Sequence, residues 1–96
     1  MKLLTDELIQ TIPVLYEQDG VENKVAYIKF FTPDAQWTWY AMEYDKNKEL
    51  FFGLVYGLEK ELGYFSLYEL ENSKGPLGLS IERDIYFEPT SVKELL

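Results

Sequence analysis

The fold is decided by residues 37–56, which read WTWYAMEY (37–44), DKNKE (45–49) and LFFGLVY (50–56). The first and third pieces are dominated by aromatic, β-branched and other apolar residues, a composition typical of strands. The charged piece between them has the length of a hairpin connection. We therefore predict two antiparallel strands joined by a loop at 45–49, with Gly53 marking a bulge or a close approach of two backbones.

Both faces of the first of these strands are largely apolar. Strict alternation places Trp37, Trp39, Ala41 and Glu43 on one face and Thr38, Tyr40, Met42 and Tyr44 on the other. Such a strand fits the middle of a sheet that is packed on both sides, or it leaves an exposed aromatic patch on one side.

Upstream of this hairpin, the sequence predicts a strand and a short helix. Residues 24–31 (KVAYIKFF) have the composition of a strand, which Pro33 ends. Near the start of the chain, Thr5 precedes two acidic residues, the pattern of a helix beginning, and Pro13 ends this N-terminal helix.

Downstream, Ser66 and Glu69 have the spacing of a capping box, which predicts a short helix over 67–72. Residues 63–65 read as a short extended piece, 75–78 (GPLG) as a turn, 85–87 (IYF) as a strand at a sheet edge, and 91–94 as a terminal helical turn. Together these segments predict an α+β fold in a single domain over residues 1–96. It has a short N-terminal helix, a mainly antiparallel sheet of about three to five strands and a short helix after Ser66.

The charge and composition exclude several classes of function. The 96 residues include 17 acidic and nine basic side chains, a net charge of −8, and neither His nor Cys. Disulfides, thiolate nucleophiles, Cys-rich zinc sites and Ser-His-Asp triads are therefore impossible. The acidic excess is spread: residues 1–48 hold five basic and eight acidic groups, and 49–96 hold four and nine. Because this charge repels phosphates, we expect no direct contact with nucleic acid or an anionic membrane.

No motif in the sequence predicts a metal ion, a cofactor or a catalytic residue. The 45–49 segment resembles the start of a calcium loop, but Leu50 stands where the loop needs Gly and Tyr56 where it needs Glu. The glycines lack the spacing of a phosphate-binding loop. There is no apolar run long enough to span a bilayer and no signal peptide, so we expect a cytoplasmic protein.

Large aromatic rings are more numerous than a core of this size needs, so some are expected at the surface, where Trp and Tyr anchor protein interfaces. The candidate partner-binding residues are Trp37, Trp39, Tyr40, Tyr44, Glu59, Glu61, Glu69, Glu71, Glu82 and Asp84. The alternative is a two-sided core whose tyrosine hydroxyls reach water. Residues 82–84 also fit a salt-bridged turn in which Arg83 forks onto a carboxylate or onto backbone carbonyls.

The chain resembles, over nearly its whole length, the small bacterial proteins catalogued as domain of unknown function 2958. The resemblance rests on MKLLT (1–5), KFFTPD (29–34), WTWY (37–40), FFG (51–53), ELGYFS (61–66), ELE (69–71), GPLGL (75–79), IERD (81–84) and YF (86–87). It implies a protein of plasmids, conjugative elements and phages, often encoded near antirestriction genes, and it assigns no catalytic residue. The 45–49 connector is shorter than in many relatives.

We therefore expect a small acidic, non-enzymatic binding protein of a mobile element, a plasmid or phage, that inhibits a host nucleic-acid-binding defence protein by protein–protein contact. It would be of the anti-CRISPR or antirestriction type, with a basic partner such as a defence nuclease, and either a monomer or a homodimer. One alternative is a structural or accessory module that self-associates through the aromatic sheet face. Another is a small hydrolase that uses two close carboxylates.

Overall fold

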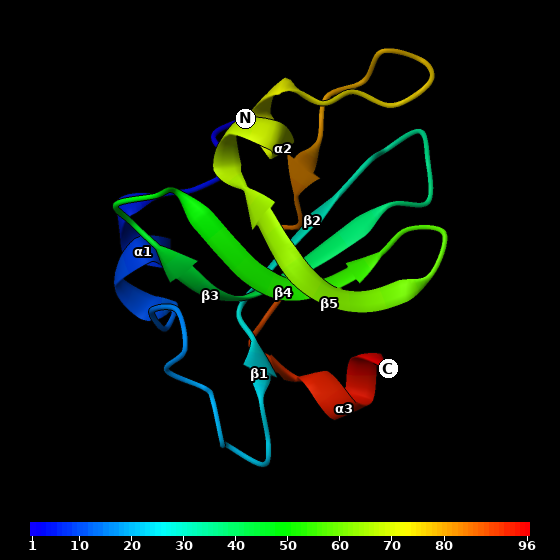
Figure 1. Ribbon diagram of the computed structural model, residues 1–96. Helices are drawn as coiled ribbons and strands as arrows, with labels where there is room; N and C mark the ends of the chain where they lie inside the picture. The colour runs from blue at the N-terminus through cyan, green and yellow to red at the C-terminus, as the bar shows by residue number, and fades with distance from the viewer.

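A computed structural model describes residues 1–96 and contains three short helices and seven strands (Figure 1). In chain order these are α1 (Asp6–Thr11), β1 (Val25–Ala26), β2 (Ile28–Phe31), β3 (Thr38–Asp45), β4 (Leu50–Tyr56), β5 (Lys60–Ser66), α2 (Leu67–Asn72), β6 (Glu82–Arg83), β7 (Thr90–Ser91) and α3 (Val92–Leu95). Five strands form an antiparallel sheet in the order β5-β4-β3-β2-β6, and β1 pairs separately with β7. The predicted α+β fold is confirmed.

The central β3–β4 hairpin forms as predicted, but a bulge changes which residues share a face. The register shifts between Ala41 and Glu43, so β3 carries one extra residue at that point. As a result Tyr44 packs in the same core cluster as Ala41, while Met42 packs in the other. The predicted strict alternation therefore holds through Met42 and is wrong beyond it. Gly53 lies opposite Ala41 and makes the close backbone approach that its position predicted.

The sheet is packed on both faces. One face carries a cluster of 12 buried residues that includes Phe30, Phe51 and Phe65, and it is covered by α1, α2 and the N-terminal Leu3 and Leu4. The opposite face carries a smaller cluster of four residues: Ala26, Met42, Leu54 and Val92. The segments that close this second side are β1 and α3, which lie together below the sheet in Figure 1.

Two of the three helices begin at the caps that the sequence predicted. Thr5 Oγ1 accepts a hydrogen bond from the Leu8 N–H at 3.3 Å at the start of α1. Ser66 Oγ accepts from the Glu69 N–H at 3.0 Å and donates to Glu69 Oε1 at 3.1 Å at the start of α2. The terminal helix α3 forms without a side-chain cap, because the Ser91 hydroxyl donates to Asn23 Oδ1 at 2.7 Å.

Two local expectations are wrong, and a third is correct but too short. The predicted strand over 24–31 is divided at Tyr27, because Ala26 pairs with β7 whereas Ile28 pairs with β3. The extended piece predicted at 63–65 is present, but it belongs to the longer strand β5.

Residues 85–87 form a turn instead of an edge strand. Asp84 holds this turn, since its Oδ1 accepts from the Tyr86 N–H at 2.9 Å and its carbonyl accepts from the Phe87 N–H at 3.2 Å. The edge position belongs to β6, two residues earlier.

Candidate partner-binding surface

Three connections meet at one end of the sheet. They are the β2–β3 loop (32–37), the β4–β5 turn (57–59) and the α2–β6 loop (73–81), which all extend toward the right of Figure 1. The helices α1 and α2 cover the other end of the same sheet face. This end of the sheet is therefore shaped by loops, which are where binding residues are most often found.

Trp37 and Trp39 form a stacked pair at this end. Their ring centroids are 5.9 Å apart with an interplanar angle of 28°. The Trp37 ring lies against Gly57 so closely that a Cβ at that position would overlap it. Its backbone is also fixed, because the Trp37 N–H donates to Thr32 Oγ1 at 3.2 Å and the Trp37 carbonyl accepts from the Thr32 N–H at 3.1 Å. The ring is thus held in place while 41% of the residue stays exposed.

Two hollows flank Trp37. The larger, of about 520 Å³, lies between the tryptophan pair and the α2–β6 loop and is lined by Thr32, Ala35, Trp37, Trp39, Ser73, Lys74, Gly75, Pro76 and Ile81. The smaller, of about 300 Å³, lies toward the β4–β5 turn and is lined by Trp37, Val55, Gly57, Leu58, Glu59 and Glu61. We call Trp37, Trp39, Val55, Gly57, Leu58, Glu59 and Glu61 the tryptophan face.

Asp34 holds the far wall of the larger hollow. Its Oδ2 accepts from the Leu77 N–H at 2.7 Å and from the Leu79 N–H at 3.5 Å. Gly75 packs against the same carboxylate, where a Cβ would overlap it. The α2–β6 loop is therefore fastened to the β2–β3 loop. From the sequence, Asp34 was expected only to end a strand, because its partners lie more than 40 positions away.

The ten predicted partner-binding residues do not share one surface. Trp37, Trp39, Glu59 and Glu61 meet on the tryptophan face. Glu69 and Glu71 are exposed on α2, whereas Glu82 and Asp84 lie at the opposite sheet edge.

Of the predicted contact tyrosines, Tyr44 is a core residue and Tyr40 is partly buried. Tyr44 is only 4% exposed, with its ring 4.6 Å from Phe51, so its expected place on a contact surface is wrong. The bulge before it turned the ring inward. Tyr40 lies on the other sheet face, where it packs on Tyr56 at 5.3 Å and on Phe87 at 5.8 Å. Burial raises the pKa of both phenols above the usual value, with a smaller contribution from nearby negative charges.

Glu43 is a buried carboxylate that the sequence did not single out as a functional group. It is 2% exposed, and its Oε1 and Oε2 accept from the Tyr16 and Gln18 N–H groups at 2.8 and 2.7 Å. Tyr16 has a left-handed backbone (φ 71°) that this bond holds. The Gln18 amide in turn bonds the backbones of Val25 and Met42. Both carboxylate oxygens therefore serve to fasten the loop after α1 to the sheet.

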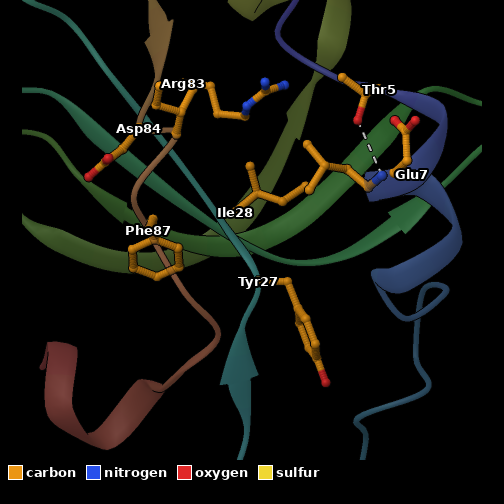
Figure 2. A pocket seen from close by; sticks show the side chains of 9 residues that line it. Thr5, Glu7, Tyr27, Ile28, Arg83, Asp84 and Phe87 are labelled. Atoms are coloured by element: carbon orange, nitrogen blue, oxygen red, sulfur yellow. Dashed lines mark hydrogen bonds between the residues drawn. The ribbon is translucent and has the colours of Figure 1, made fainter.

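A third hollow, of about 270 Å³, lies between α1 and the segment after β6 (Figure 2). The Arg83 guanidinium reaches across it and donates to the carbonyls of Lys2 and Leu3, each at 3.0 Å. This is the arrangement on backbone carbonyls that the sequence allowed for Arg83. The carboxylates of Glu7 and Asp84 lie on opposite sides of the hollow (Figure 2), and Asp84 instead pairs with Lys29 at 3.8 Å.

No group of three or more acidic side chains is placed to hold a metal ion. None of the helices has the length and apolar character of a membrane span.

The fold and this surface define a small α+β domain that presents a fixed pair of tryptophans between loops. The family model described as "Protein of unknown function (DUF2958)" matches residues 3–93, and the chain belongs to this family. The resemblance drawn from the sequence motifs is thereby confirmed. No match was found among curated proteins or among solved structures.

Proposed function

We propose that the chain is a non-enzymatic protein that binds a basic protein partner through the tryptophan face. The observation that carries this proposal is Trp37, whose ring is fixed by Gly57 and Trp39 yet is 41% exposed between two hollows. Tryptophan is enriched among residues that dominate binding energy. A ring that is already fixed loses little further freedom when a partner covers it.

Charge supports a basic partner. Glu59 and Glu61 are exposed beside Trp37. The only ion pair between side chains is Lys29–Asp84, so the other carboxylates of this −8 chain have no cationic partner. The negative electrostatic field of these carboxylates attracts a basic surface and speeds association with it.

Proteins that bind nucleic acid carry basic grooves for the phosphates. We therefore propose that the partner is a nucleic-acid-binding defence protein of a bacterial host. The chain, encoded by a mobile element, would inhibit this protein by binding to it.

The hydrolase alternative has less support. Such an enzyme needs one carboxylic acid held protonated by an apolar wall, close to an ionised partner. The one buried carboxylate, Glu43, has both oxygens bonded to backbone N–H groups. Glu59 and Glu61 are exposed. The available carboxylates thus fit the recognition of a cationic surface better than acid–base chemistry.

The test compares three baits in a lysate of the native host: the wild-type chain, Trp37→Ala and the control Tyr86→Ala. Tyr86 is 86% exposed and lies away from the tryptophan face, after β6. The wild type and the control should retain one basic nucleic-acid-binding protein, identified by mass spectrometry, that Trp37→Ala loses. Calorimetry with that purified partner should show binding about 30-fold weaker for Trp37→Ala.

The same titration in rising salt should weaken binding, and Glu59→Gln with Glu61→Gln should reduce this salt dependence. Circular dichroism verifies that each variant is folded. Equal binding of Trp37→Ala and the wild type, or binding that salt does not change, contradicts the proposal.

A further inference from the structure

The two edges of the five-stranded sheet differ. The β6 edge is two residues long, and the start of the chain covers it: the Arg83 N–H donates to Met1 Sδ at 3.1 Å. The β5 edge is seven residues long, and none of its backbone groups bonds any segment other than β4. In Figure 1, β5 crosses the front of the molecule. The structure therefore has one closed edge and one open edge.

The hydrogen bonds at both ends of the β4–β5 pair fix which backbone groups of β5 point outward. The Gly57 N–H donates to the Glu59 carbonyl at 3.1 Å, and the Leu67 N–H donates to the Glu49 carbonyl at 3.0 Å. Both pairs continue the β4–β5 register, in which Gly53 is opposite Gly63. In an antiparallel pair, hydrogen-bonded positions recur at every second residue. The odd-numbered residues of β5 therefore bond β4, and the N–H and C=O groups of residues 60, 62, 64 and 66 point outward.

The middle of this edge carries none of the features that discourage pairing with another strand. Natural edge strands are usually protected by proline, a bulge, charged side chains or short length, and the charges of β5, Lys60 and Glu61, lie at its first two positions. β5 has no proline and no bulge, and its side chains Leu62 and Tyr64 are 53% and 52% exposed. A long, partly apolar edge of this kind is a template for a further strand.

We propose that β5 pairs with β5 of a second copy of this chain, antiparallel and about a two-fold axis at Gly63. Outward groups must face outward groups, so even-numbered residues of one copy pair with even-numbered residues of the other. Full overlap of Lys60–Ser66 then occurs in one register, with Leu62 opposite Tyr64 of the second copy. The two sheets become one continuous sheet.

The edge is complementary to itself in this register. Leu62 and Tyr64 meet twice across the axis, which covers the part of each side chain that faces the second copy. Gly63 faces Gly63 of the second copy, where no side chain intervenes. Lys60 comes opposite Ser66, whose hydroxyl bonds Glu69, so the ammonium group approaches the acidic start of α2. The same patch thus supplies both halves of the contact, as a two-fold dimer requires.

The central test uses charges at the two-fold axis. A Cβ at Gly63 would meet nothing within 4 Å, so the chain can accept a side chain there. Gly63→Asp and Gly63→Lys each place like charges opposite each other in the dimer. Each should raise the dimer dissociation constant about fivefold relative to the matched Gly63→Asn, measured by sedimentation equilibrium. An equimolar mixture of Gly63→Asp and Gly63→Lys should recover the lost affinity through heterodimers.

A second variant tests the backbone bonds. Leu62→Pro removes an N–H that has no partner within one copy, so the strand should persist. Two hydrogen bonds are lost per dimer, and we expect dimerisation about 30-fold weaker. Leu62→Thr, which keeps the N–H, should weaken it less.

Three results overturn the proposal: a wild-type chain that is monomeric at every concentration, a dimer that these variants do not change, or no recovery in the mixture. If β5 instead takes an extended segment of a different protein, the purified chain stays monomeric. The proposal is independent of partner binding, because Trp37→Ala leaves β5 unchanged and should leave the dimer intact.

Discussion

Gly53 and Gly63 lie opposite each other in the β4–β5 ladder, but an added methyl group meets different surroundings at the two positions. At Gly53 a Cβ would overlap the Tyr40 carbonyl oxygen and lie 3.0 Å from the Tyr40 carbonyl carbon and 3.1 Å from Ala41 Cα. These are all backbone atoms of the central strand, beside its bulge, so no side-chain rotation relieves the overlap. At Gly63 nothing lies within 4 Å.

We therefore expect the same substitution to have opposite effects. Gly53→Ala should lower the free energy of unfolding by about 3 kcal/mol, the upper end for overpacking, because only a backbone shift relieves it. For a domain of this size, that is a fall in Tm of about 12–24 °C. Gly63→Ala should raise the free energy of unfolding by about 0.5 kcal/mol, because alanine restricts the unfolded chain without creating a clash.

The measurement is urea and thermal unfolding followed by far-UV circular dichroism, at protein concentrations low enough to keep each variant monomeric. Equal dependence of the unfolding free energy on urea in all three proteins verifies that the comparison concerns stability alone. If Gly53→Ala unfolds within about 1 kcal/mol of the wild type, or if Gly63→Ala is the more damaging change, the close β3–β4 approach does not constrain the fold as argued.

Two further predictions concern groups inside the fold. Glu43→Gln should lower the free energy of unfolding by about 2 kcal/mol, because an amide NH₂ then faces one of the two N–H donors, of Tyr16 or Gln18. Hydrogen exchange at those two amides should become faster, and unchanged exchange would contradict the prediction. Burial, then the charge of Glu49, raises the pKa of Tyr44 above 10, so the neutral phenol stabilises the folded state. This contribution should be constant below about pH 10 and lost as pH rises through the raised pKa. The free energy of unfolding of Tyr44→Phe should therefore fall less with rising alkaline pH than that of the wild type. Equal pH profiles of the two proteins would refute this.

Local signals in the sequence predicted the elements whose stability is local. The caps at Thr5 and Ser66 work within three residues, and the 45–49 connector joins strands that are adjacent in the chain. The break at Tyr27 was not predictable in this way. It exists because Ala26 pairs with Thr90, which lies more than 60 positions away, whereas the composition of 24–31 is uniform.

The candidate surface was predictable only in part, because some of its contacts join residues that are distant in the sequence. An excess of rings identified Trp37 and Trp39 as surface candidates, and the structure places them together. The excess could not tell that Tyr44 is buried, because one extra residue in β3 reverses which side of the strand it occupies. Nor could it find Asp34, whose contacts are made by backbone N–H groups of a distant loop. Backbone partners leave no residue-type signature in a sequence.

The two proposed contacts should respond to salt in opposite directions. Binding of a basic partner brings opposite charges together, so screening weakens it. Self-association brings together two chains of charge −8. The single Lys60 at each end of the β5 contact offsets little of that repulsion, and screening should therefore strengthen the dimer.

Antiparallel pairing about an axis perpendicular to the sheet also keeps the two tryptophan faces on the same side of the dimer. Near physiological salt a dimer could thus engage two partner sites, and linkage would raise its overall affinity beyond that of one face.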